Sequence, residues 1–442
     1  MITLRKLFSL SATILLTHTL VAQQVTPFEQ IRRYVSAKAP GKTDSAYYNF
    51  FKTFKPGDIN YLRPIYEAIG WDDRVKKAYG EKSFNDIFSQ QLAMVADYRM
   101  AESYANKNLD TLPPDGRTFI QQQVKQIRDL QSINAATYIV GRALDAKVVM
   151  INEAHDKPLH RAFTYSLLEP LYQQGYRYLA MEMLNNFGND SVKKVDHRTG
   201  YYAQDPVAGE LIRKALALGF TLVPYEDTAG TRHSANVRDS IQAANIYRII
   251  QKDPAAKILV HAGYGHISEA SLGGEIIPLG LAFKTQTGID PLTVNQTNFT
   301  EGSTTDFGRL YHKELMQKIS IDEPVVLLKG RKLYTLIEQE GYDIYVVHPS
   351  TVYKNNRPSW LSFNGERKEV SVSPQERNLF MVQAYYEDEF NNAPLEQLIP
   401  ADQTYIASDY GYYSLYLKPG RYKLVFRDVG YQQLNVREKQ VQ

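Results

Sequence analysis

The chain has 442 residues, of which 43% are hydrophobic and 22% are charged, the composition of a soluble globular protein of two or three domains. Its 51 basic and 48 acidic residues leave a formal charge of +3, which gives no support for a nucleic-acid partner. Because the sequence has no cysteine, it excludes a thiol nucleophile, a thiolate metal site and any disulfide.

Residues 1–22 have the pattern of a secretory signal peptide. Arg5 and Lys6 precede an apolar run, and Ala22 supplies a small residue for cleavage. The run is short and interrupted by polar residues, so a membrane-spanning helix is the weaker interpretation, and no second apolar run of about 18 residues follows. We therefore expect an exported protein, periplasmic or extracellular, with no transmembrane segment after signal removal.

The region from residue 23 to 145 is predicted to be helical and to pack on the core. Apolar residues recur at helical spacing over 84–95 and again over 120–130. Ser83 is expected to cap the first of these helices, and Pro113–Gly116 is expected to form a turn before the second. We assign these stripes to packing and not to chemistry.

Residues 146–352 alternate between strand and helix patterns. Four strand–helix repeats in succession predict an α/β domain with a mainly parallel sheet flanked by helices. The expected strands are 147–151, 178–181, 220–223 and 257–260, the helices between them are 160–174, 208–218 and 236–250, and further strands are expected at 291–294, 325–328 and 342–347.

Residues 357–442 are predicted to form a small β-sandwich accessory domain. Apolar residues alternate over 413–417 and 422–426, with Pro419-Gly420 turning between them, and Asn364-Gly365 is a hairpin signal.

Polar residues gather where the predicted strands of the α/β domain end. Because the carboxyl ends of parallel strands meet at one edge, where open α/β sheets bind ligands, these residues are expected to share one pocket. They are Glu153 and His155 after the first strand, Glu182 after the second, Glu226 and Asp227 after the third, and His261, Gly263 and His266 after the fourth.

Glu153 and His155 form the most informative pair. Two residues apart in extended chain, their side chains point the same way, and a carboxylate beside an imidazole suits a general base. Together with Glu182 and His261, the pair also offers ligands for a divalent metal such as Mn²⁺, Co²⁺, Zn²⁺ or Fe²⁺.

The remaining candidates have weaker signals, and each can also be an ordinary structural residue. His160 and Arg161 open a helix whose unpaired N–H groups favour an anion. The turn from Gly263 to Gly265 lets the backbone approach a ligand and donate N–H groups to a developing oxyanion. The others are Glu226 and Asp227, which can equally be loop carboxylates or a helix cap, Arg238, which can pair with them or with a substrate carboxylate, and His266.

At these residues the sequence resembles the superfamily of erythromycin esterases, ChaN-type haem-uptake proteins and Tiki-type proteases. Residues 152–160 resemble its first motif, 179–183 its second, and 238–245 followed by 259–266 its third. The match covers about residues 146–350, and it departs from the family at Asn152, where the usual residue is glycine.

The resemblance implies an α/β core with its site at the strand ends, but no single activity. Esterase-like members use the first-motif histidine to activate water, Tiki-like members are metal-dependent proteases, and ChaN-like members bind haem. Carried over by position, His155 is the base or a metal ligand, Glu153 and Glu182 orient water or bind metal, His261 or His266 completes the site, and Arg238 holds an acidic group.

Three functional hypotheses follow. The first is hydrolysis of a small-molecule or peptide substrate by activated water, with or without a divalent metal. The second is binding of haem, or of another ligand, without turnover, with histidine or tyrosine as axial ligand. The third is a degenerate core in a scaffold or adhesion protein that acts through residues 357–442.

Overall fold

The computed structural model describes residues 26–38, 59–107, 113–186, 192–229, 232–303, 306–334, 341–406 and 412–442. The predicted signal peptide, residues 1–22, lies outside these ranges. None of the helices within them is both long and apolar enough to cross a bilayer.

A mixed nine-stranded sheet forms the centre of the molecule, in the order β1-β7-β9-β6-β2-β5-β3-β4 with β8 paired to β7. The run from β9 to β4 is parallel, whereas β7 is antiparallel to both its neighbours β1 and β9. The predicted mainly parallel α/β architecture is therefore confirmed. The strands are β1 (Leu130–Asn134), β2 (Val148–Glu153), β3 (Tyr176–Met181), β4 (Thr221–Pro224), β5 (Lys257–Gly263), β6 (Leu292–Phe299), β7 (Val325–Lys329), β8 (Lys332–Leu333) and β9 (Ile344–Val347).

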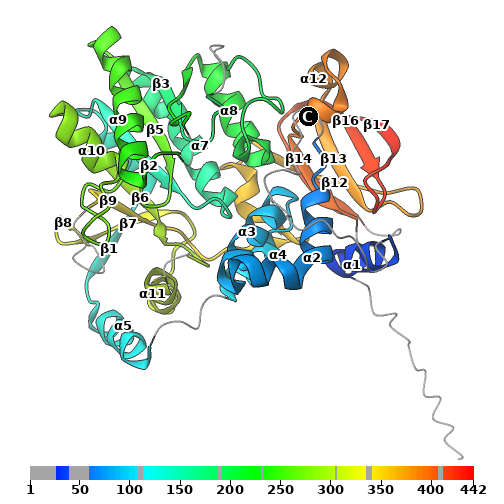
Figure 1. Cartoon of the computed structure of the whole chain (residues 1–442), viewed down its shortest axis with the longest axis horizontal. Helices are drawn as coiled ribbons and strands as arrows, with labels where there is room; N and C mark the ends of the chain where they lie inside the picture. Colours follow the sequence, from blue (N-terminus) through cyan, green and yellow to red (C-terminus); the bar gives the residue numbers. More distant parts are fainter. Residues whose placement is uncertain are drawn as a thin grey trace, which may run out of the picture.

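Helices cover both faces of this sheet (Figure 1). Every residue of β2 is buried, and its side chains alternate between two cores. Val149 and Ile151 join the core with α7 (Pro158–Gln173) and α8 (Pro206–Leu218), while Val148 and Met150 join the core with α9 (Ala235–Lys252) and α10 (Leu279–Thr287). A strand buried this way carries polar groups only where it ends.

The N-terminal region is mainly helical, with α1 (Pro27–Lys38), α2 (Arg63–Tyr79), α3 (Glu81–Met94), α4 (Tyr98–Asn106), α5 (Pro114–Gln126) and α6 (Ala135–Arg142). α1 to α4 bury their apolar faces in the same core as α7 and α8. α5 instead packs with α11 (Asp306–Met316) against the far end of the sheet.

Three details of the N-terminal prediction are wrong. The second apolar stripe is not one helix, because α5 ends at Gln126 and Leu130 begins β1, which pairs antiparallel with β7. Pro113 and Pro114 begin α5 instead of forming a turn, because the missing N–H of a proline has no cost in the first helical turn. α3 starts at Glu81 after Gly80, so Ser83 lies inside the helix and does not cap it.

The C-terminal region contains two antiparallel sheets that enclose one core. One sheet pairs β12 with β15, and the other has the order β14-β13-β16-β17. Val370 and Leu415 of the first contact the same core as Val382 and Leu424 of the second, which is the arrangement of a small sandwich. The elements are β12 (Lys368–Val372), β13 (Met381–Tyr386), α12 (Glu387–Asn392), β14 (Asp402–Tyr405), β15 (Tyr413–Leu417), β16 (Gly420–Arg427) and β17 (Gln433–Val441).

The predicted hairpin at Asn364-Gly365 is wrong. That turn follows a 3-10 helix at Ser359–Ser362, and the N–H of Gly365 donates to the carbonyl of Ser362. The hairpin lies earlier, where β10 (Tyr353–Lys354) pairs with β11 (Arg357–Pro358) through two asparagines of positive φ. Asparagine tolerates this conformation, so the turn at 355–356 closes a two-residue loop.

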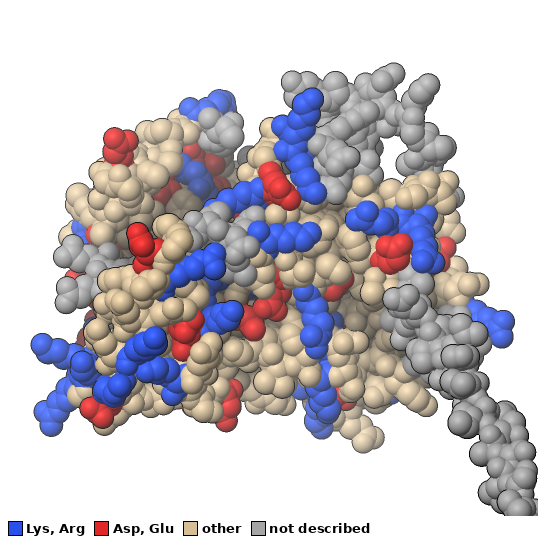
Figure 2. Space-filling view, turned by 90° about the horizontal axis from the view of Figure 1, so that it is seen from below, with Lys and Arg blue, Asp and Glu red and all other residues tan. Residues whose placement is uncertain are grey.

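Acidic and basic side chains are interspersed on the face of the molecule shown in Figure 2. This distribution is what the nearly balanced charge of the sequence leads one to expect.

Candidate functional site

A cavity of about 230 Å³ lies at the carboxyl ends of β2, β3 and β5. Parallel pairing places Glu153 beside Gly263 and Met181 beside His261, so the residues after each strand reach the same edge. The structure thus brings together most of the residues singled out in the sequence. The lining consists of Glu153, His155, Glu182, Met183, Tyr201, Tyr202, Glu226, Arg238, His261, Ala262 and Gly263.

A buried chain of charges leads to His155. Asp205 Oδ2 accepts from Arg161 Nη1 at 2.9 Å, and Arg161 donates to both oxygens of Glu153, at 2.6 and 2.8 Å. Glu153 Oε1 in turn lies 3.0 Å from His155 Nδ1. Because the side chains of Arg161, Glu153 and Asp205 are at most 2% exposed, these contacts are shielded from solvent.

This chain fixes the tautomer of His155. Burial favours the neutral acid, but Arg161 outweighs it and holds the pKa of Glu153 well below its ordinary value. An ionised carboxylate can only accept, so the hydrogen lies on His155 Nδ1. Nε2 of the neutral ring is therefore an acceptor, the form that a general base requires.

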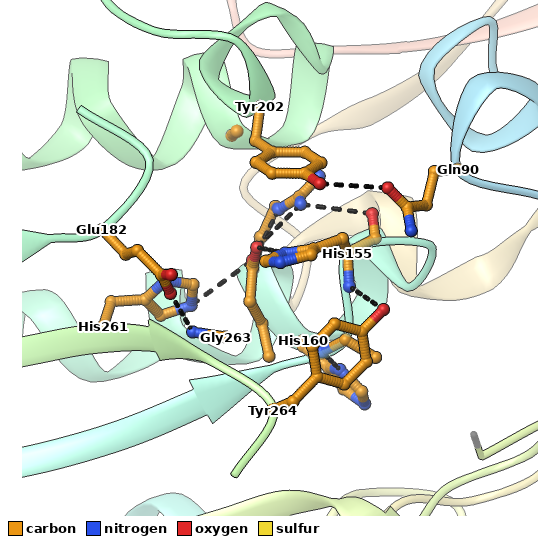
Figure 3. Close-up of polar contacts among 12 residues, drawn as sticks. Gln90, His155, His160, Glu182, Tyr202, His261, Gly263 and Tyr264 are labelled. Atoms are coloured by element: carbon orange, nitrogen blue, oxygen red, sulfur yellow. Dashed lines mark hydrogen bonds and ion pairs between the residues drawn. The ribbon is translucent and has the colours of Figure 1, made fainter. Parts of the chain in front are cut away.

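Two tyrosines hold the imidazole in place (Figure 3). Tyr202 stacks on it with ring centroids 4.1 Å apart, and Tyr264 meets it edge-on at 4.8 Å. The hydroxyl of Tyr202 donates to Gln90 Oε1 at 3.1 Å, so α3 of the helical region fixes the ring that covers His155.

Glu182 is the second carboxylate of the cavity. Its Oε1 accepts from Arg238 Nη2 at 2.6 Å, and its Oε2 accepts from the backbone N–H of Gly263 at 2.6 Å. Burial opposes ionisation, but nearby His266, His155 and Arg238 outweigh it and lower the pKa of Glu182 to about 2. Arg238 also donates to Glu226, so it holds the two carboxylates together.

The prediction that the turn from Gly263 to Gly265 donates its N–H groups to an oxyanion is therefore wrong for Gly263 and Tyr264. The Gly263 N–H is taken by Glu182, and the next N–H, of Tyr264, donates to the carbonyl of Glu153 at 2.7 Å. Donors already bonded within the protein cannot stabilise a developing charge on a substrate without giving up those bonds.

Gly263 instead serves the site by leaving space. A Cβ built on it would lie 2.7 Å from His155 Cε1, 3.0 Å from His155 Nε2 and 3.0 Å from Glu182 Oε2. The imidazole and the carboxylate therefore face the same small volume.

Gly263→Ala is expected to displace His155 and Glu182 and to reduce the affinity or activity of the site at least tenfold, because a methyl group would fill the space between them. Crystal structures of both proteins would show the shift. Gly141→Ala, where no heavy atom lies within 4 Å of the added methyl, is the matched control. An unchanged site in the Gly263→Ala protein would contradict this assignment.

His261 lies beneath the cavity and is 1% exposed. Burial lowers its pKa to about 4, so the ring is neutral near pH 7. Among the residues that the structure describes, its Nε2 has no hydrogen-bond partner, and it lies 3.7 Å from Glu153 Oε2.

Three sequence-predicted residues are not among the cavity lining. His160 is fully buried, and its Nδ1 accepts from the N–H of Ala154, so it fixes the loop after β2 instead of binding an anion. Asp227 pairs with His233 at 2.6 Å. His266 lies behind Arg238, and its Nδ1 donates to Asp239 at 2.9 Å.

The side chains of the cavity do not fit the predicted metal site. The oxygens of Glu153 are occupied by Arg161 and His155, and those of Glu182 by Arg238 and a backbone N–H. A divalent ion would have to displace a buried guanidinium that already supplies positive charge. Within the described ranges, no group of three or more His, Asp or Glu side chains is arranged to hold a metal.

The cavity is also a poor match for haem. At about 230 Å³ it is smaller than the roughly 300–1,000 Å³ of pockets that enclose drug-sized ligands, and carboxylates and Arg238 form much of its wall. His155 Nε2 is free to act as an axial ligand, but the surrounding space does not accommodate a porphyrin.

The side chain of Asn152, which stands where the family motif has glycine, makes hydrogen bonds that a glycine could not make. Its amide donates to the carbonyl of Tyr264 at 2.7 Å, and its Oδ1 accepts from the N–H of Gln296 at 2.8 Å. The side chain thus ties β2 to the turn after β5 and to β6, on the side away from the cavity lining.

Arg161 carries the main role that sequence analysis missed. The sequence placed it at a helix start facing an anion, and the anion proves to be Glu153. No local pattern singles out its partner Asp205, whose carboxylate also caps α8 by accepting from Ala208 N–H at 3.1 Å. Tyr202 and Gln90 lie far apart in the sequence and gave no signal.

Two buried, neutral histidines lead us to expect that the folded protein loses stability in acid. Burial lowers the pKa of His261 to about 4 and of His348 to about 3, against about 6.5 in an unfolded chain. The unfolded state therefore binds more protons below pH 6.5, and each histidine is expected to cost about 2 kcal/mol of stability by pH 5.

Guanidinium unfolding at pH 7 and pH 5 at constant ionic strength measures this loss. His348→Gln is expected to reduce the pH slope by up to about one proton. Equal stability at both pH values would rule out the low pKa values assigned to His261 and His348.

Comparison with family models, with curated proteins and with solved structures gives no match for this chain. The superfamily resemblance therefore rests on its motif residues.

Proposed function

We propose that the protein is a metal-independent hydrolase in which His155 activates a water molecule. The observation that carries this proposal is the His155–Glu153 contact, with Nδ1 donating to a carboxylate that Arg161 keeps ionised. That arrangement leaves Nε2 as the base and stabilises the imidazolium that forms when it takes a proton.

Glu182 supports the placement of the water. Its Oε2 and His155 Nε2 face the same volume beside Gly263. A water in that volume donates one hydrogen to each group and presents a lone pair to the substrate. Proton transfer to Nε2 accompanies formation of the bond to the carbonyl carbon, whose π bond opens and leaves negative charge on its oxygen. The imidazolium of His155 then gives the proton to the leaving alcohol or amine as its bond to the carbon breaks, and the carboxylic acid product forms.

Arg238 supports charge neutralisation in the cavity. Of the described lining residues it is the one cation, and its side chain is 30% exposed. Its Nε and Nη2 are bonded to Glu226 and Glu182, but Nη1 contacts only His266 Nε2 among the described residues. The second hydrogen of Nη1, in place of the predicted backbone donors, can be directed at an oxygen that becomes negative as water attacks. The substrate is a small ester, amide or peptide group, and the expected setting is the periplasm or the exterior of the cell.

Purified protein is expected to hydrolyse at least one member of a panel of esters, amides and peptides. The rate should be the same with EDTA and with added Mn²⁺, Co²⁺ or Zn²⁺, because Arg161 and Arg238 already occupy the carboxylates. An inert protein, or activity that appears only when metal is added, would contradict the proposal.

A further inference from the structure

A second histidine–carboxylate pair lies behind the cavity wall, between the turn after β5 and the helix α9. His266 Nδ1 donates to Asp239 Oδ2 at 2.9 Å, and the same oxygen accepts from the N–H of Leu279, the first residue of α10, at 3.2 Å. The backbone of His266 is also fixed, because its N–H donates to the carbonyl of Gly263 and its carbonyl accepts from the N–H of Gly280. Contacts from three elements therefore hold this imidazole in one orientation.

The other ring nitrogen of His266 faces Arg238. Its Nε2 lies 3.2 Å from Arg238 Nη1, and because the hydrogen of the neutral ring lies on Nδ1, Nε2 is the acceptor of this contact. The other two nitrogens of the guanidinium bond to Glu226 and Glu182. His266 therefore fixes Nη1, the nitrogen whose second hydrogen is available to the cavity.

A proton on Nε2 would turn this contact from attraction into repulsion. The protonated ring has two donors and no acceptor, so the new N–H and those of Arg238 Nη1 would point at each other. Glu182 Oε1 lies 3.8 Å from Nε2 and already accepts from Arg238 Nη2 at 2.6 Å. An imidazolium at His266 would therefore compete with Arg238 for Glu182.

The charges around His266 favour binding of this proton. Burial opposes protonation, but the hydrogen bond to Asp239 and the charges of Glu182 and Asp239 outweigh it and raise the pKa of His266 above its ordinary value, although Arg238 opposes them. These charged groups come from α9 and from the end of β3, whereas α10 contributes backbone N–H groups to the contacts. Glu226, after β4, contacts Arg238. The side chain of His266 is 25% exposed, so protons reach it from solvent.

We propose that His266 is a positioning residue that makes the candidate site sensitive to protons. The neutral ring aims Arg238 at the cavity, and protonation of the ring releases the guanidinium. The effect on turnover rests on the hydrolysis proposed above, whereas the link between the His266 proton and Arg238 is a property of the folded protein alone. The two parts can therefore be tested separately.

NMR titration of the full-length protein, labelled with ¹³C at the histidine Cε1 atoms, tests the link without a substrate. Asp239→Asn should lower the pKa of His266 and Arg238→Gln should raise it, because the first removes a charge that favours the imidazolium and the second removes one that opposes it. The signal that is missing from His266→Gln identifies the ring. Asp322→Asn, at an exposed position, is the control and should leave this pKa unchanged. A His266 pKa that does not respond to Arg238→Gln would overturn the proposal, whether or not the protein is a hydrolase.

Kinetics on a substrate of the wild-type protein test the consequence for turnover. His266→Leu should lower kcat about tenfold with little change in KM, because Arg238 is still present but is no longer aimed. His266→Gln should recover most of this loss, since its amide oxygen can accept from Nη1. Its kcat/KM should also fall less steeply in acid than that of the wild type, because glutamine takes up no proton.

Identical pH profiles for the wild-type protein and His266→Gln would refute this inference and leave hydrolysis at His155 standing. A purely structural histidine would behave in that way, since its replacement can lower the rate but leaves the shape of the profile unchanged. Should the wild-type protein prove inert on every substrate, the proposed hydrolysis fails, and the NMR titration alone decides whether His266 and Arg238 are linked.

Discussion

His155→Gln is expected to lower kcat/KM about 10²–10⁴-fold on any substrate that the wild-type protein hydrolyses. Glutamine keeps a polar side chain beside Glu153 but cannot accept a proton from water. KM should change little, because the imidazole acts on water and not on substrate binding. Steady-state kinetics on the substrate found in the panel measures the loss.

The control for this variant is His233→Gln, a histidine outside the cavity lining whose replacement should leave the rate unchanged. Circular dichroism and thermal unfolding check that the His155→Gln protein is folded. If that folded variant kept the wild-type rate, His155 would not be the base.

Arg161→Met is expected to destabilise the protein by about 3–5 kcal/mol, the largest effect on stability that the structure indicates. Methionine fills much of the same volume but leaves Glu153 and Asp205 buried at 1% exposure or less without their cation. Their carboxylates then repel each other, and the pKa of Glu153 loses the influence that keeps it low. Denaturant unfolding measures the change.

Arg142→Met, at an exposed position in α6, is the matched control and should change stability by no more than about 0.5 kcal/mol. Similar stabilities of the two variants would mean that Arg161 is not the centre of the buried charge chain. Partial rescue in the double variant Arg161→Met, Glu153→Gln would show directly that the unpaired carboxylate causes the loss.

The sequence predicts the α/β layer and the meeting of Glu153, His155, Glu182 and His261 because both follow from strand pattern and parallel topology. A polar residue lies at or near the carboxyl end of each of these strands, and the carboxyl ends of parallel strands share one edge. The strand β1 escaped prediction because its identity depends on pairing with β7, almost 200 residues later.

The wrong details of the site have a common physical origin. Whether Gly263 N–H is free for a ligand depends on Glu182, and whether His160 faces the cavity depends on the N–H of Ala154. Both are competitions between a ligand and a partner within the protein, and residue spacing does not reveal which partner wins. Arg161 and Asp205 illustrate the same point, since their pairing joins α7 to the start of α8 across 44 residues.

The hydrogen bond from Tyr202 to Gln90 makes the helical region part of the catalytic apparatus that we propose. Local opening of α3 releases Tyr202 and leaves one face of the imidazole bare while the central sheet is still intact. Heating would then inactivate the protein below the temperature at which the sheet melts, so residual turnover would report the docking of α3 and not the survival of the whole fold.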